Sequence, residues 1–209
     1  MLGATLFFRG PRRAAAAGML LVGANASSQI LKPLLAHHRD LSHWPVPQIP
    51  DASYPSGHAT ASMSLALACV LVAPRAYRPL VAAAGGALAV AESFSVVVLN
   101  WHFPSDTVGG YLLAGAWSLA ALAALRAVDA RWPAAGTFRG VARSAIADAA
   151  LPAITAGVVL ASAFLLITHA HEVNDFARAH TASVAVGGGI VLSALIVLGA
   201  LTALSRRRT

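Results

Sequence analysis

Two short stretches of the sequence combine histidine with groups that bind anions. The first is Pro55-Ser56-Gly57-His58, where a loop enters a long apolar run. The free N–H groups and the dipole of a helix start attract an anion, and Gly57 has no Cβ, so the anion can approach the backbone closely. Ser56 adds a hydroxyl donor, and His58 adds a side chain that titrates near neutral pH. This stretch is therefore predicted to bind an anion and to move a proton.

The second stretch places His102 four residues before Asp106, with Pro104 and Ser105 between them. On a helix, this spacing puts both side chains on one face. A carboxylate that accepts a hydrogen bond from one imidazole nitrogen fixes the tautomer and leaves the other nitrogen free to attack. Because histidine can act as a covalent nucleophile, His102 is the predicted nucleophile. Ser105 is expected to cap the helix that follows.

Lys32 and Arg39 supply fixed positive charge upstream of both stretches. Phosphoryl transfer requires that charge on the non-bridging oxygens be neutralised and that a nucleophile attack in line. Arginine grips phosphate with two hydrogen bonds, whereas lysine acts as a point charge. These cations, together with backbone N–H groups, predict a metal-independent site without a cofactor. A metal site at His169, His171 and Glu172 is the less favoured alternative, because two histidines at this spacing rarely suffice.

Together these residues resemble the type-2 phosphatidic acid phosphatase family, which includes bacterial polyprenyl-diphosphate phosphatases. The signature of that family is Lys-x6-Arg-Pro, then Pro-Ser-Gly-His, then Ser-Arg-x5-His-x3-Asp. The chain contains the second element complete and matches the spacing of the other two, at Lys32, Arg39, Ser95, His102 and Asp106. Three elements in the right order are far more specific than any one of them alone.

The resemblance, which covers about residues 14–127, implies a role for each matching residue. His102 attacks phosphorus and forms a phosphohistidine, and Asp106 orients it. His58 protonates the leaving oxygen and then activates water for the second step. The phosphoryl oxygens are held by residues of the first two elements: Lys32, Arg39, Ser56 and the Gly57 N–H.

The chain departs from the family pattern in three ways. Arg39 is followed by Asp40 instead of proline, and the arginine after Ser95 is replaced by Val96. In the family that arginine binds phosphate, and losing a comparable donor costs on the order of 2–4 kcal/mol in the transition state. Accessory contacts could replace it in part, but without the bidentate fork, from His37, His38 and Asn100. The third departure is architectural: family members often have two spans before the lysine-bearing one, whereas this chain has none there and adds two at its C-terminal end.

The elements that must position these residues are long apolar runs. Only 11% of the residues are charged and 57% are hydrophobic, whereas soluble chains average roughly a quarter charged residues. A bilayer-spanning helix needs about 20 apolar residues. Six runs approach this length: 14–36, 56–74, 79–100, 104–127, 148–169 and 181–204. The predicted fold is therefore all-α, a polytopic membrane helical bundle of about six transmembrane helices.

The basic residues predict the orientation of these spans. Counted on alternate sides, twelve of the fifteen lie on one side and three, Lys32, Arg39 and Arg178, on the other. The positive-inside rule makes the richer side cytoplasmic. Both termini are then cytoplasmic and the site is extracytoplasmic, at the cell membrane. The net charge of +7 therefore reflects topology, and no nucleic-acid partner is expected.

We divide the membrane domain into a phosphatase-like helical core at 1–128, a cytoplasmic linker at 129–147 and two additional transmembrane helices at 148–209. Glu92 stands in the middle of the third run. An ionisable residue there is a functional candidate, and the alternative is a neutral carboxyl bonded to Ser62, Ser64 or Ser93. The glycine pairs 85–86 and 109–110 are expected to allow close helix packing.

The predicted function is hydrolysis of a lipid phosphomonoester or diphosphate through a phosphohistidine. Polyprenyl carriers such as undecaprenyl diphosphate are the first choice of substrate, and lipids of the phosphatidic acid type are the second. The alternative is a catalytically weakened relative that binds or transports a phosphorylated lipid, and an unrelated membrane protein is the third reading. The oligomeric state stays open, a homo-oligomer included.

Overall fold

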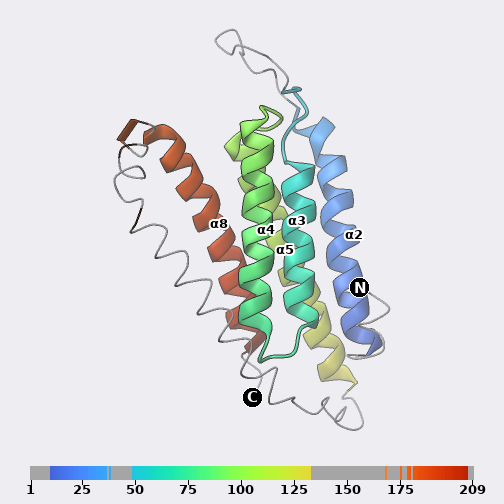
Figure 1. The fold of residues 1–209 in the computed structure, drawn as a ribbon. Coiled ribbons are helices and arrows are strands. Elements are labelled where there is room, and N and C mark those ends of the chain that lie inside the picture. Colours follow the sequence, from blue (N-terminus) through green and yellow to red (C-terminus); the bar gives the residue numbers. More distant parts are fainter. Residues whose placement is uncertain are drawn as a thin grey trace. The chain divides into compact units, whose positions relative to one another are not determined.

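The computed structural model describes residues 10–36, 38, 49–132, 168, 175, 178–179 and 181–206. All regular structure in these residues is helical, as the sequence predicted. The helices are α2 (Pro11–Leu34), α3 (Gly57–Val72), α4 (Arg78–Val98), α5 (Pro104–Arg131) and α8 (Thr181–Arg206) (Figure 1).

The ends of these helices follow from local sequence. Proline occupies one of the first two positions of α2, α4 and α5, where its missing N–H has no intrahelical partner to lose. Helix α4 ends before Asn100, which adopts a left-handed conformation with φ of 55° that asparagine tolerates better than most residues. The expected cap at Ser105 was wrong. Helix α5 already begins at Pro104, and Asp106 accepts a hydrogen bond from the N–H of Phe103 at 3.1 Å.

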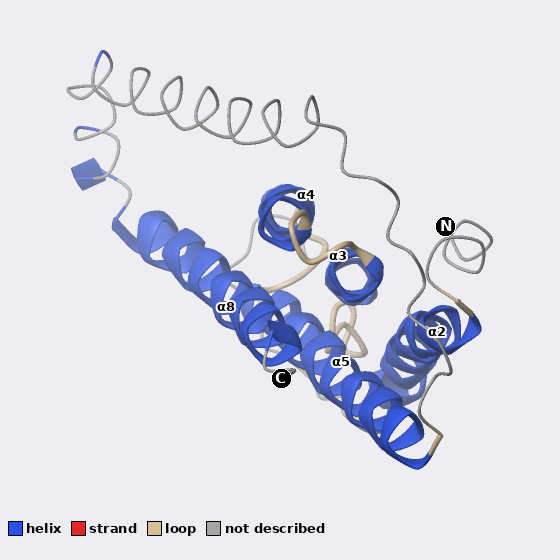
Figure 2. Ribbon diagram, turned by 90° about the horizontal axis from the view of Figure 1, so that it is seen from below, coloured by secondary structure: helices blue, strands red, loops and turns tan. Residues whose placement is uncertain are grey.

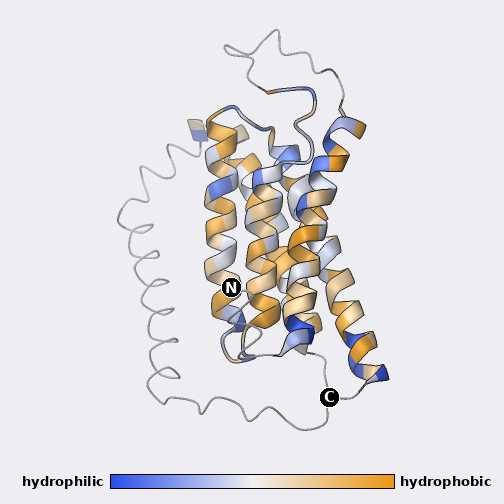
Figure 3. Cartoon of the chain, turned by 90° about the vertical axis from the view of Figure 1, so that its right-hand side faces the viewer, coloured by the Kyte–Doolittle hydropathy of each residue, from blue (hydrophilic) through white to orange (hydrophobic). Residues whose placement is uncertain are grey.

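The chain is a multi-pass membrane protein. Four of the described helices, α2, α4, α5 and α8, are long and apolar enough to cross a bilayer. Figure 3 shows hydrophobic residues along the helices, with hydrophilic residues concentrated toward their ends. Large apolar side chains such as Leu88, Leu112 and Ile196 stay exposed, as helix faces in contact with lipid do. The predicted span 148–169 lies, except for Thr168, outside the described residues, so the count of six and the proposed domain boundaries stay predictions.

Helix α3 lies between α2, α4 and α5 (Figure 2). It has 16 residues and is about 24 Å long at 1.5 Å per residue, less than the roughly 30 Å of a hydrocarbon core. Its residues Ala59, Thr60, Met63 and Leu67 are fully buried. Because its neighbours enclose it, this short helix is positioned by protein contacts, and its first turn carries Gly57 and His58.

Small residues bring the other helices close to α3. A Cβ on Gly85 of α4 would lie 2.8 Å from the Cβ of Ala66, and a Cβ on Gly110 of α5 would lie 2.8 Å from the carbonyl oxygen of Ser56. A Cβ on Gly109 would overlap the ring of Tyr54. The expected packing role of these glycines is therefore confirmed, and on α5 they lie just after Asp106.

Arginines hold the opposite end of the bundle together. Arg78 is buried and donates to the carbonyl oxygens of Ser205 at 3.0 Å and Ala73 at 3.3 Å. Arg126 donates to the carbonyl oxygen of Leu204. Residues 189–206 of α8 belong to the same compact unit as α2 to α5, and these two arginines attach them to α4 and α5. Arg78, Arg126 and the carbonyl groups that they bind lie at the end of the bundle that is predicted to be cytoplasmic.

Candidate active site

Lys32 and the two histidine-containing stretches of the sequence meet at one end of the helices; we call Lys32–Arg39, Pro55–His58 and His102–Asp106 the three polar stretches. Lys32, in the last turn of α2, has its Nζ 3.3 Å from the position that a Cβ on Gly57 would take. The N–H of Ser56 donates to the carbonyl oxygen of Asp106 at 2.8 Å. The ring centroids of His58 and His102 are 5.9 Å apart. One bond and two close approaches therefore join α2, the start of α3 and the start of α5.

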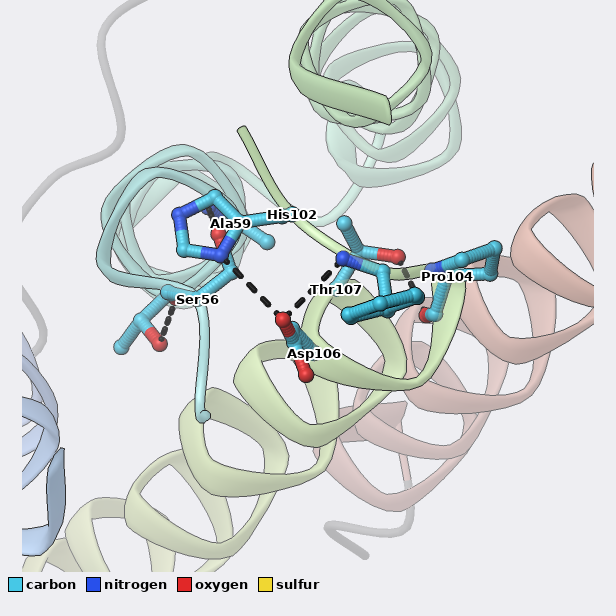
Figure 4. Close-up of polar contacts among 8 residues, drawn as sticks. Ser56, Ala59, His102, Pro104, Asp106 and Thr107 are labelled. Atoms are coloured by element: carbon cyan, nitrogen blue, oxygen red, sulfur yellow. Dashed lines mark hydrogen bonds and ion pairs between the residues drawn. The ribbon is translucent and has the colours of Figure 1, made fainter. Parts of the chain in front are cut away.

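Ser56 is the N-cap of α3. Its Oγ accepts the N–H of Ala59 at 3.3 Å, and its carbonyl oxygen accepts the hydroxyl of Thr60 at 2.7 Å (Figure 4). Pro55 precedes the cap, and the bond between Tyr54 and Pro55 is cis. The capping bond uses Oγ as an acceptor, and Ser56 is fully buried, so a donor role for its hydroxyl toward phosphate stays a prediction. The sequence predicted the donor and missed the cap.

His102 and Asp106 are buried next to one another. The Nδ1 of His102 is 3.4 Å from Oδ2 of Asp106 (Figure 4), and the two residues are 7% and 0% exposed. The same Oδ2 accepts the N–H of Phe103 at 3.1 Å, which fixes the carboxylate. With Asp106 on Nδ1, the nitrogen of His102 that remains for attack is Nε2. The structure thus brings His102 and Asp106 together, and their roles as nucleophile and orienting group stay predictions.

His58 is exposed at the second position of α3. Its ring meets that of His102 edge-on, at an interplanar angle of 69°. Trp101 lies on another side of it, with ring centroids 5.9 Å apart and a tilt of 39°. Sequence reasoning missed Trp101, although its position next to His102 was a usable signal. The indole is 46% exposed and lies beside the predicted acid.

The start of α3 has a cation beside it. A Cβ on Gly57 would meet Lys32 Nζ at 3.3 Å and Gln29 Nε2 at 3.4 Å. Gln29 is a second residue that the sequence reasoning missed, and its spacing of three from Lys32 places both on one helix face. Together they place two donors beside Gly57 in the first turn of α3, whose N–H groups also attract an anion.

The remaining predicted phosphate contacts have different outcomes. Arg39 and His37 lie outside the described residues. His38 is exposed, and its Nδ1 is 3.7 Å from Asp51 Oδ1. Asn100 donates its N–H to the carbonyl oxygen of Val97 at 3.0 Å and forms the turn after α4. The left-handed backbone conformation of this turn explains why asparagine occupies position 100. A contact between Asn100 and substrate stays a prediction.

Val96 stands where the family pattern has arginine, and its side chain is only 3% exposed. Its carbonyl oxygen accepts the N–H groups of Trp101 at 2.9 Å and His102 at 3.3 Å. Residue 96 therefore holds the backbone of the predicted nucleophile, but its side chain brings no charge to the site.

The described part of the chain contains no cluster of three or more histidine, cysteine, aspartate or glutamate side chains arranged to hold a metal ion. The alternative metal site at His169, His171 and Glu172 lies outside that part. The described residues that the structure brings together at this end of the helices include His58, His102 and Asp106.

Comparison with known proteins gives one match. No curated protein and no solved structure matches the chain. The family model described as the PAP2 superfamily matches residues 14–129, which include all three polar stretches. Members of that superfamily are generally phosphatases that act on phosphorylated lipids or related substrates. With more than half of its length matched, the chain belongs to the PAP2 superfamily.

Proposed function

We propose that this protein hydrolyses a phosphomonoester or diphosphate of a lipid through a phosphohistidine on His102. The observation that carries this proposal is the buried pair of His102 and Asp106, with Nδ1 and Oδ2 3.4 Å apart, beside the exposed ring of His58. A nucleophile, its orienting acid and a second proton-transfer group are the three parts that a two-step transfer requires.

In the first step, Nε2 of His102 attacks phosphorus while the bond from phosphorus to the leaving oxygen breaks. Asp106 stabilises the positive charge that develops on the imidazole. His58 donates a proton to the leaving oxygen. Lys32 and the N–H groups at the start of α3 neutralise the non-bridging oxygens, which carry the spread charge of the transition state.

In the second step, His58 accepts a proton from water as the water oxygen attacks phosphorus. The bond between phosphorus and Nε2 breaks, phosphate leaves, and His102 returns to its starting state. The same imidazole thus acts first as an acid and then as a base, as microscopic reversibility requires for a symmetric double displacement.

A lipid substrate fits the position of the site. His58 and Trp101 are exposed at the ends of apolar helices, and an aromatic ring of this kind suits the headgroup layer of a membrane. An amphiphile can place its phosphate there while its tail stays in the bilayer. We propose polyprenyl phosphates or diphosphates as the first substrate class and lipids of the phosphatidic acid type as the second. The arginine distribution supports a site on the extracytoplasmic face, with both termini cytoplasmic.

One observation favours the alternative function of a weakened relative that binds or moves a phosphorylated lipid. Val96 replaces a phosphate-binding arginine and is buried, so the phosphate clamp loses a bidentate donor. If Lys32 and the α3 N-terminus suffice for binding but not for the transition state, the protein retains the lipid without cleaving it.

Phosphate release by the purified protein decides between these functions. The substrates are a short-chain polyprenyl diphosphate, its monophosphate and a short-chain phosphatidic acid. Each is tested with the wild type and with the variants His102→Ala and Asp106→Asn. We expect His102→Ala to abolish turnover. The acid-labile labelling of the protein by ³²P-substrate should be lost in the same variant. Asp106→Asn should reduce kcat by about 10³–10⁴-fold, as in other histidine–aspartate pairs. No release from the whole panel, with lipid binding retained, would establish the binding function instead.

A further inference from the structure

Glu92 is an ionisable side chain of α4 that the proposed reaction does not yet use. It is half-buried within the membrane-spanning part of the helix. Its Oε2 is 3.3 Å from Oγ of Ser62 on α3. A carboxylate inside a membrane bundle is energetically costly, so its position there requires either a function or a neutralising partner.

Its partner connects it to the predicted acid. Ser62 follows His58 by four residues on α3, so the two side chains share one face and lie about one turn, roughly 5.4 Å, apart along the axis. Two opposite charges about one helical turn apart still attract each other where the local dielectric constant is low. Glu92 therefore lies one turn deeper in the bundle than His58, within range of its charge.

The same geometry argues against direct contact between Glu92 and the phosphoryl group. Val96 follows Glu92 by one turn on α4, is 3% exposed and is nearer to the site. A carboxylate also repels a phosphate. Asp106, the other buried carboxylate, is engaged by His102 and by the Phe103 N–H. An effect of Glu92 on the reaction would therefore be transmitted through His58.

We propose that Glu92 is a positioning residue for His58, whose carboxylate stabilises the protonated imidazole. This inference rests on the proposed function. As the bond from phosphorus to the leaving oxygen breaks, His58 gives its proton to that oxygen. In the second step it regains a proton from water, and Glu92 again stabilises the cation. Glu92 itself neither gains nor loses a bond to substrate.

Ser62 can hold this carboxyl group in either charge state. Its Oγ is 3.3 Å from Glu92 Oε2 and 3.3 Å from the carbonyl oxygen of Ala59. A hydroxyl has one hydrogen, which goes to Glu92 when the carboxylate is charged. When Glu92 is protonated, it can donate to Ser62, which then donates to Ala59. The contact thus keeps Glu92 in place while the charge of its neighbour changes during turnover.

The experiment uses leaving groups of different basicity. Glu92→Gln keeps the size of the side chain and the bond from Ser62 but removes the charge. We measure kcat/KM for a short-chain phosphatidic acid, whose alkoxide must be protonated, and for p-nitrophenyl phosphate, whose phenolate leaves without a proton. We expect a fall of roughly tenfold with the lipid and less than about twofold with the aryl ester, a part of the 10²–10⁴ that a general acid contributes.

The ratio of the two kcat/KM values does not depend on the fraction of folded protein, so partial misfolding cannot imitate the result. The matched control is Asn25→Ala, which removes a bond of 3.2 Å to Ser64 between α2 and α3 and should change both substrates equally. Glu92→Asp keeps the charge and should retain the wild-type ratio, which provides a second measurement if Glu92→Gln does not fold.

Equal falls with both substrates, or no fall with either, would overturn the role of Glu92. Failure of the proposed function is a different result, because the wild type would then release no phosphate from either substrate, or His102→Ala would remain active.

Discussion

The close approach of α5 to the start of α3 gives the most direct test of how the site is assembled. Gly110 lies opposite the Ser56 cap, and a Cβ there would be 2.8 Å from the Ser56 carbonyl oxygen and 2.9 Å from the Thr60 nitrogen. Both are backbone atoms and cannot rotate away. In Gly110→Ala, the two segments must separate by about 0.6 Å before the shorter contact reaches 3.4 Å, where ordinary packing begins.

That movement has two consequences. It strains the bond of 2.8 Å between the Ser56 N–H and the Asp106 carbonyl oxygen, and overpacking of this kind costs about 1–3 kcal/mol of stability. It also moves His58 away from His102. Because a displacement of 1 Å can cost about 10²-fold in rate, a shift of 0.6 Å predicts a fall in kcat of about tenfold.

The assay is phosphate release from the best substrate of the panel, with kcat and thermal unfolding measured on the same preparation. Gly18→Ala on α2 is the matched control, because no atom lies within 4 Å of the position of its Cβ, and we expect its kcat to equal that of the wild type. A Gly110→Ala protein with wild-type kcat would refute the reasoning, since the site would then tolerate separation of the two stretches.

Three further predictions concern charged or buried positions. Lys32→Met should lower kcat/KM by about 10–100-fold, because it removes the cation beside the α3 N-terminus, whereas Arg131→Met at the other end of α5 should not; equal values for the two variants would contradict a phosphate contact. Val96→Arg places a guanidinium one turn from Glu92, in the spacing that forms ion pairs. Because this ion pair would engage the Glu92 carboxylate, we expect kcat with a lipid substrate to fall. A tenfold gain in kcat would show instead that the native phosphate clamp is deficient. Arg78→Met removes two bonds from a buried cation to carbonyl oxygens, so the free energy of unfolding should fall by about 2–4 kcal/mol while kcat per folded molecule stays unchanged; an unaltered unfolding transition would show that α8 is held by other contacts.

The fold class followed from the long apolar runs, because a run of about 20 apolar residues is the length of a membrane-spanning helix, which satisfies its backbone hydrogen bonds within one segment. The ends of α2, α4 and α5 fell within a few residues of the predicted runs. The cap at Ser105 was wrong because Pro104 starts α5 one residue earlier and Asp106 serves the Phe103 N–H. The start of such a helix depends on which side chain accepts a hydrogen bond from a free N–H group of the first turn. The sequence offered two candidates, Ser105 and Asp106.

The sequence predicted that His102 and Asp106 lie together, but the argument from helical spacing was wrong: His102 precedes α5, which begins at Pro104, and Asp106 contacts it from the first turn of that helix. The matches of Lys32, Gly57 and His58 to a family pattern were also visible in the sequence. What the sequence could not provide was the distance between these stretches, since the register of one helix against another depends on packing over its whole length.

Only the tertiary structure decided which residues surround the histidines. Gly109 and Gly110 let α5 approach the Ser56 cap, and that approach places His58 beside His102. It also brought Trp101 against His58, and it selected Ser62 from the three serines that the sequence offered as partners for Glu92. These contacts join residues that are far apart in the chain or that lie in irregular backbone, so no periodicity predicts them. The sequence alone determined the chemistry of the individual groups, and side-chain packing between the helices determined which of those groups act together.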